Sequence, residues 1–190
     1  SFSKKNLLIT YHPVTLEGSD CSVNHVCELL DTLSKLVDTT LIITMPNADT
    51  GGMAIKAIIY EFANKCTNVK IFNSLGQSLY FSCLNNVDGI VGNSSSGLLE
   101  APSFNIGTIN IGNRQKGRIK AESIIDCEPN TDSISKALKT LYSSKFQKKL
   151  INVKNPYDNG HTSSAICEVL KKQNLTSICK KKFYDIPNSK

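Results

Sequence analysis

The amino-acid sequence predicts an α/β fold: a doubly wound, mostly parallel, Rossmann-like sheet with helices on both faces. Short apolar, β-branched runs alternate with amphipathic segments of helical period, which is the pattern of β-α-β units. The 190 residues, 40% of them hydrophobic, suffice for one sizeable core and are short for two. No repeat or low-complexity linker interrupts the pattern. We therefore expect a single domain over residues 1–190, with a tail from about residue 174 that packs or is flexible.

The first elements follow from local pattern. The run LLITYHP (7–13) is unbroken and apolar, which predicts a buried strand. Residues 20–37 carry apolar side chains three and four positions apart, as in an amphipathic helix. The β-branched run 40–46 predicts a second strand, which Pro46 ends.

The later elements continue the alternation. Strands are expected at 69–75, 89–92, 105–112 and 123–128, and helices at 53–65, 78–87, 133–144 and 161–173. A further helix begins at Gly97, and Pro102 shortens it. Because ligands of open parallel sheets bind beyond the carboxyl ends of the strands, site residues are expected at the strand-to-helix junctions.

Charge and cysteine content limit the classes of function. The net charge is +6, and much of it lies in runs at 145–149 and 171–182. Such runs are typical of solvated helix faces and frayed termini. Nucleic-acid binding would need an Arg-rich helix or an aromatic platform, neither of which is found, whereas a cleft for a phosphate-bearing small molecule fits the charge equally well.

The seven cysteines form no C-x-x-C pair and do not cluster in sequence with the three histidines, so neither a disulfide framework nor a zinc site is predicted. The apolar runs are shorter than a membrane span. We expect a reduced cytoplasmic protein without a metal.

Two early junctions carry polar candidates. In YHPVTLEG (11–18) the His-Pro peptide keeps His12 out of helical geometry and places its ring at a strand end. In MPNADTGG (45–52) the turn is denser in polar groups than capping requires. Each junction is also compatible with a purely structural role.

The stretch GIVGNSSSGLLEAPSFNIGTINIG (89–112) is the most unusual. Its serines place hydroxyl and backbone N–H groups at a helix start, which favours an anion, although neither a Walker loop nor a G-x-G-x-x-G fingerprint is present. Glu100 lies too far from Ser94 to contact the same phosphate, and a carboxylate there suits the paired hydroxyls of a ribose. Phosphate and sugar together indicate a nucleotide. The following loop, GNRQKGR (112–118), adds Arg114 and Arg118, which suit phosphate or a solvated loop.

The order of these motifs, with NPYDNGHTS (155–163) and KKFYDI (181–186) after them, resembles the carboxyl half of the UDP-N-acetylglucosamine 2-epimerase family. It is similar to the hydrolysing branch, which serves sialic-acid-type sugar synthesis, since GNSSSG and NRQKGR replace motifs typical of the other branch. The resemblance covers about residues 7–186. It implies the second Rossmann-like domain of a GT-B-type enzyme, with UDP-sugar bound in the cleft between two domains.

The resemblance also implies residue roles. Ser94 and Ser95 contact the diphosphate, Glu100 holds the ribose, and Arg114 reaches the nucleotide. His12 is the catalytic candidate near the diphosphate and reacting sugar. Asn47 faces the ligand, and Tyr80 lies beside the uracil or, equally, in a helix core. The Asp158-Asn159-Gly160 sequence departs from the family's G-D-G.

The implied reaction removes the proton at sugar C2, expels UDP by anti elimination and adds water to the glycal, giving N-acetylmannosamine or an analogue. The acid and base groups for this belong to the absent amino-terminal domain, so this half alone binds UDP and turns over nothing. No cofactor or metal is implied, and a homodimer of the full-length enzyme is compatible with the family. A GT-B glycosyltransferase donor domain and a non-catalytic UDP sensor stay open as alternatives.

Overall fold

The computed structural model describes residues 3–14, 19–47, 51–174, 176 and 179–180. Its contacts divide the chain into two units, Ser1–Tyr157 and Asp158–Lys190. The second unit contains helix α7 (Thr162–Lys172), in which every side chain is exposed. The first unit contains the sheet and the helices that cover it.

The sheet has six strands in the order β3-β2-β1-β4-β5-β6, and all neighbouring pairs are parallel. The strands are β1 (Lys5–Thr10), β2 (Thr39–Thr44), β3 (Val69–Phe72), β4 (Gly89–Gly92), β5 (Gly107–Ile111) and β6 (Ile124–Cys127). This confirms the predicted doubly wound α/β fold. The strand order reverses between β1 and β4, so the topological switch point lies between the ends of those two strands.

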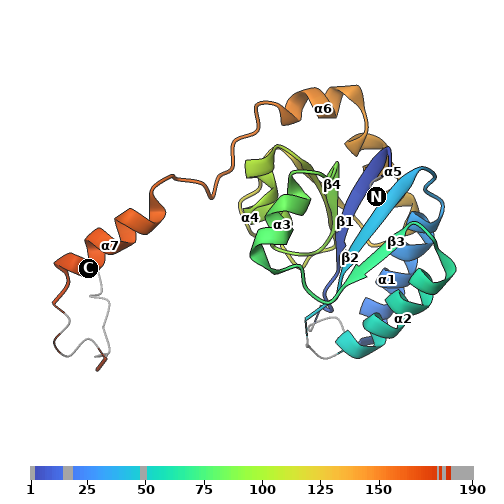
Figure 1. Ribbon diagram of the computed structural model, residues 1–190, viewed down its shortest axis with the longest axis horizontal. Coiled ribbons are helices and arrows are strands. Elements are labelled where there is room, and N and C mark those ends of the chain that lie inside the picture. Colours follow the sequence, from blue (N-terminus) through green and yellow to red (C-terminus); the bar gives the residue numbers. More distant parts are fainter. Residues whose placement is uncertain (1–2, 15–18, 48–50, 175, 177–178, 181–190) are drawn as a thin grey trace, which may run out of the picture. The chain divides into compact units, whose positions relative to one another are not determined.

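Helices cover both faces of the sheet in the first unit. They are α1 (Ser19–Ser34), α2 (Gly52–Lys65), α3 (Gly76–Leu84), α4 (Ser96–Leu99), the 3-10 helix η1 (Ala101–Phe104), α5 (Thr131–Leu141) and α6 (Ser144–Leu150). Figure 1 shows α1 and α2 on one face and α3 and α4 on the other.

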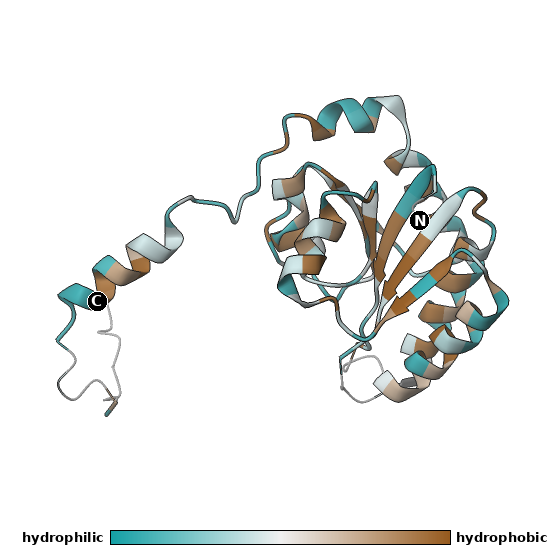
Figure 2. Cartoon of the chain, in the orientation of Figure 1, coloured by the Kyte–Doolittle hydropathy of each residue, from teal (hydrophilic) through white to brown (hydrophobic). Residues whose placement is uncertain are grey.

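The two faces of the central strands β1, β2 and β4 contribute to two different cores. Leu7 and Ile9 of β1 lie in the larger core with residues of α1, α2 and α5, whereas Leu8 lies in the smaller one with residues of α3. Buried strands with apolar residues on both faces are expected of a sheet covered on both sides. The strands are accordingly largely hydrophobic in Figure 2.

Several element bounds differ from the prediction: the strand expected over 69–75 ends at Phe72, and the helix expected over 78–87 is Gly76–Leu84. Two further differences have a clear cause. The strand expected over 7–13 ends at Thr10, because its ladder partners Thr44 and Gly92 are the last residues of β2 and β4. The helix expected over 133–144 ends at Leu141, and α6 follows as a separate helix whose Ser143 N-cap accepts from the N–H of Phe146 at 3.3 Å.

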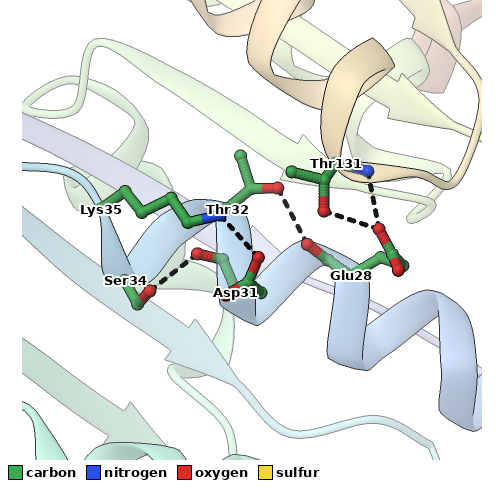
Figure 3. Close-up of polar contacts among 6 residues, drawn as sticks. All are labelled: Glu28, Asp31, Thr32, Ser34, Lys35 and Thr131. Atoms are coloured by element: carbon green, nitrogen blue, oxygen red, sulfur yellow. Dashed lines mark hydrogen bonds and ion pairs between the residues drawn. The ribbon is translucent and has the colours of Figure 1, made fainter.

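Polar contacts fix α1 against the start of α5. Glu28 accepts hydrogen bonds from the hydroxyl and the N–H of Thr131, at 2.6 and 2.8 Å (Figure 3). These bonds favour the carboxylate, and the pKa of Glu28 is lowered, mainly by the Thr131 hydroxyl and then by its N–H. The contact ties together segments 103 residues apart in the sequence.

Candidate functional site

A cavity of about 560 Å³ opens at the carboxyl ends of β1 and β4, where the strand order reverses. Loops that follow β1, β2, β3 and β4 line it. Five of the residues predicted from the sequence are among its lining: His12, Asn47, Tyr80, Ser94 and Glu100. Residues that are distant in sequence are thus brought to one place, as the parallel topology requires.

The cavity wall depends on a close approach between β4 and β1. Gly92 has φ of 142°, and a Cβ atom built on it would lie 2.0 Å from the carbonyl oxygen of Thr10. Only glycine combines this backbone geometry with so short a separation. The approach lets the N–H of Asn93 donate to the same Thr10 carbonyl at 3.2 Å, so the chain turns immediately after the strand.

His12 lies in this turn region and is buried, with 8% of its surface exposed. Its backbone N–H donates to Oδ1 of Asn93 at 2.7 Å, and its carbonyl accepts from Nδ2 of Asn93 at 2.8 Å. Its ring Nδ1 accepts from the backbone N–H of Asn47 at 3.2 Å. Because Nδ1 is an acceptor, the neutral imidazole carries its proton on Nε2.

The serine turn provides hydrogen-bond donors. Across the described part of the chain, the backbone N–H groups of Ser94 and Ser95 have no protein acceptor, while their carbonyls accept from the first residues after the turn. Helix α4 has only four residues, so its dipole is small, and the attraction for an anion comes from these local N–H groups. Ser94 lines the cavity, whereas Ser95 does not.

The third serine was not singled out from the sequence, and it connects two residues that were. Ser96 Oγ donates to Oε2 of Glu100 at 2.5 Å and is also hydrogen-bonded to the Tyr80 hydroxyl. Since Ser96 has one hydroxyl proton, the Tyr80 hydroxyl is the donor in the second bond. Ser96 and Glu100 are four residues apart, and this helical spacing could have revealed the pair.

The environment keeps Tyr80 protonated. Burial raises the pKa of the Tyr80 hydroxyl to about 12, and the nearby Glu100 carboxylate adds to this, while the bond to Ser96 acts in the opposite direction. At neutral pH the side chain is therefore a neutral donor. The Tyr80–Ser96–Glu100 chain orients one oxygen of the carboxylate and leaves the phenol ring against the cavity.

Arg114 is placed differently from the other predicted residues, because it is not among the residues that line the cavity. Its Nη1 donates to the carbonyl of Asn93 at 3.1 Å, and Nε2 of the buried Gln115 donates to the same oxygen at 2.8 Å. Asn93 and Gln115 are further residues that sequence reasoning missed. Their bonds join positions 81 and 22 residues apart, which local spacing does not reveal.

Two negative findings apply to the described residues. No group of three or more His, Cys, Asp or Glu side chains there is arranged to bind a metal ion. No helix in the same ranges has the length and apolar character needed to cross a membrane.

Comparison with known proteins identifies the family. The sequence profile described as UDP-N-acetylglucosamine 2-epimerase matches residues 1–171. The chain is 40% identical over 185 residues to the GDP/UDP-N,N'-diacetylbacillosamine 2-epimerase (hydrolyzing) of Campylobacter jejuni, covering 96% of this chain and 47% of that protein. It is 33% identical over 168 residues to the UDP-N,N'-diacetylbacillosamine 2-epimerase (hydrolyzing) of Legionella pneumophila, covering 88% and 43%.

A solved structure of similar fold is that of the Methanocaldococcus jannaschii UDP-GlcNAc 2-epimerase in complex with UDP-GlcNAc and UDP. The TM-score is 0.68 at 16% identity, over 88% of this chain and 45% of that one. The chain spans about half the length of the curated relatives it matches. The resemblance inferred from the motifs is confirmed: the chain belongs to the UDP-N-acetylglucosamine 2-epimerase family and corresponds to its carboxyl-terminal domain.

Proposed function

We propose that this chain is the UDP-binding half of a hydrolysing UDP-sugar 2-epimerase. The observation that carries the proposal is the cavity at the β1–β4 switch point, where His12, the serine turn and the Ser96–Glu100 pair converge from different loops. Nucleotide ligands of doubly wound sheets bind at this position. Family membership supports the same ligand class.

The diphosphate is proposed to lie at the serine turn. The N–H groups of Ser94 and Ser95 that have no protein acceptor among the described residues suit phosphate oxygens, and the Ser94 hydroxyl adds a donor. Arg114 is proposed to reach the same group by leaving the Asn93 carbonyl or by using its other guanidinium nitrogens. Together these groups offset the charge of the leaving UDP.

The nucleoside is proposed to lie on the other side of the cavity. Glu100 suits the two ribose hydroxyls, since a carboxylate accepts from both, and Ser96 fixes its orientation. Tyr80, whose ring borders the cavity, is proposed to lie beside the uracil, and Asn47 to face the ligand from the loop after β2. These placements rest on the family resemblance together with the cavity geometry.

His12 is proposed to act at the reacting bond. When the C1–O bond of the sugar breaks, the electron pair goes to the diphosphate oxygen, and a ring N–H near that oxygen stabilises the developing charge. The proton at C2 is taken by a base in the other half of the enzyme, which leaves a glycal. Water then adds to the glycal: its hydroxyl goes to C1, and a proton goes to the face of C2 opposite the one from which the first proton was removed. The products are therefore UDP and the 2-epimeric free sugar.

The sugar is proposed to be a UDP-2-acetamido sugar, with UDP-N,N'-diacetylbacillosamine ahead of UDP-N-acetylglucosamine. The names of the two relatives described above support this order. A relative at 34% identity is the Escherichia coli polysialic acid biosynthesis protein P7, which supports a role in sialic-acid-type sugar synthesis. We further propose a single domain over 1–190, a cytoplasmic location, and a homodimer for the full-length enzyme.

Calorimetric titration tests the nucleotide site. The chain should bind UDP saturably and weakly, and it should bind 2′-deoxy-UDP less well, because one hydroxyl for Glu100 is missing. Glu100→Gln should weaken UDP binding by about tenfold or more, as expected for loss of charge-assisted hydrogen bonds, and should reduce the preference for UDP over the deoxy compound. Ser94→Ala should weaken UDP binding by a few-fold.

The matched control is Glu61→Gln, since Glu61 lies on α2 in an exposed pair with Lys65 and does not line the cavity. It should leave UDP binding unchanged. Absence of saturable UDP binding, or equal losses in the Glu61 and Glu100 variants, would contradict the proposed site. Release of free sugar from a UDP-sugar by this chain alone would contradict the proposed division between the two halves.

A further inference from the structure

We propose that Asn93 is a positioning residue that holds His12 and Arg114 as one unit on the leaving-group side of the cavity. The inference rests on the proposed function, because the value of the arrangement depends on a diphosphate bound there. Its basis is the geometry of a residue that is 0% exposed and makes five hydrogen bonds through its backbone and side chain.

The side chain of Asn93 extends the pairing of β1 and β4 by one residue. The ladder ends with Thr10 opposite Gly92. Beyond it, the primary amide of Asn93 takes the place of a peptide unit, accepting from the N–H of His12 at 2.7 Å and donating to its carbonyl at 2.8 Å. The backbone of His12 is thereby fixed although it lies outside the strand.

The backbone carbonyl of Asn93 fixes the loop after β5. A carbonyl oxygen has two lone pairs, and here they accept from Arg114 at 3.1 Å and from Gln115 at 2.8 Å. Asn93 is also attached to β1 through its own N–H, which donates to Thr10. One residue therefore connects the ends of three neighbouring strands, β1, β4 and β5.

The chemistry requires an amide at this position. A carboxylate could accept from the N–H of His12 but would repel its carbonyl oxygen, and a hydroxyl is too short to reach both. Because donors stabilise charge only when they are held in place before the charge develops, displacement of His12 or Arg114 should weaken contacts to the diphosphate more than contacts to the nucleoside.

The experiment compares UDP with uridine. Affinities for both are measured by NMR titration of the whole chain as wild type, Asn93→Ala and the control Asn68→Ala. Asn68 also donates through its side-chain amide to a backbone carbonyl, that of Thr39, but Thr39 begins β2 and therefore lies at the sheet edge opposite the cavity. Asn93→Ala should weaken UDP binding about tenfold and change uridine binding less than twofold, the scale of about one well-placed hydrogen bond.

Amide hydrogen exchange provides a readout that needs no nucleotide. The N–H of Asn47 donates to the His12 ring and does not touch Asn93, so its exchange reports whether the ring stays in place. The exchange rate of the Asn47 N–H should increase about tenfold in Asn93→Ala. The N–H of Leu41, which donates to the Asn68 backbone carbonyl, should stay within about twofold as the internal reference.

If Asn93→Ala does not fold, the near-isosteric Asn93→Asp replaces it, judged on Asn47 exchange alone because the added charge itself repels a diphosphate. Equal proportional losses for UDP and uridine, or unchanged Asn47 exchange, would overturn the positioning role. If the wild type binds neither ligand, the proposed function fails, and the exchange measurement alone decides whether Asn93 positions His12.

Discussion

Replacing Gly92 by alanine tests the close approach of β4 to β1 on which the cavity depends. The added Cβ would lie 2.0 Å from the Thr10 carbonyl oxygen and 2.8 Å from its carbonyl carbon. Real Cβ contacts essentially never fall below 3.0 Å, so the two strands must separate by about 1 Å. The clashing atoms belong to the backbone and cannot rotate away.

The expected cost has two parts. Overpacking against a fixed backbone costs about 1–3 kcal/mol, and forcing a side chain to adopt the φ of 142° costs about 1–3 kcal/mol. Gly92→Ala should therefore lower the free energy of unfolding by about 2–6 kcal/mol, a large share of the stability of a typical domain.

Gly112→Ala provides a comparison in which the backbone has a positive φ but an added Cβ meets no clash. Gly112 has φ of 70°, and a Cβ atom added to it would have no neighbour within 4 Å, so its substitution should cost only the conformational part, about 1–2 kcal/mol. Urea denaturation followed by far-UV circular dichroism measures both variants, with an unchanged m-value expected. Equal losses in the two variants would refute the steric argument. The same separation of strands should also weaken UDP binding, because Asn93 is attached to Thr10.

Two further predictions concern titrating groups. Hydrogen bonds from Thr131 lower the pKa of Glu28 in the folded state, so the stability that they contribute is present above the ordinary pKa of a glutamate and is lost as the pH falls through the lowered value. Thr131→Val should therefore lower the urea midpoint at neutral pH and have little effect in acid. A change in the midpoint that is independent of pH would contradict this. Burial, and to a smaller extent the neighbouring carboxylates, raise the pKa of the Cys127 thiol to about 12. Iodoacetamide at pH about 8 should therefore label the exposed Cys27 and spare Cys127 until urea is added, which mass spectrometry of the peptides measures. Equal labelling rates of the two cysteines in the folded protein would refute this.

The sequence predicted the fold, and it predicted that candidate residues would converge at one sheet edge, because both depend on local pattern and on one rule of topology. Apolar runs marked the six strands, and parallel connections bring every strand end to the same edge of the sheet. Residues directly after strands, such as His12 and Ser94, could therefore be predicted to converge without knowledge of the strand order. Their detailed roles stay predictions, since they depend on a ligand.

The residues and elements that the sequence did not reveal depend on partners far away in the sequence or on the spacing of residues along a helix. Asn93 stands in the same motif as the serines, but its importance comes from His12 and Gln115, which only the strand order brings near it. Helix α6 was missed for a local reason: its lysines dominated the interpretation of 145–149, although Phe146 and Leu150 lie four residues apart and are both buried.

The titratable groups of the cavity suit hydrogen bonding to an anion better than removal of a proton, and this agrees with the proposed division of labour between two halves of an enzyme. The titratable side chains among the described residues that line it are His12, Tyr80 and Glu100. His12 has its Nδ1 lone pair occupied by the Asn47 N–H, Tyr80 stays protonated at neutral pH, and Glu100 accepts from Ser96. Such a site donates hydrogen bonds to a leaving diphosphate but is poorly equipped to remove a proton from carbon. In the proposed reaction, the base for sugar C2 would then come from outside this cavity, in line with the proposed division between two domains.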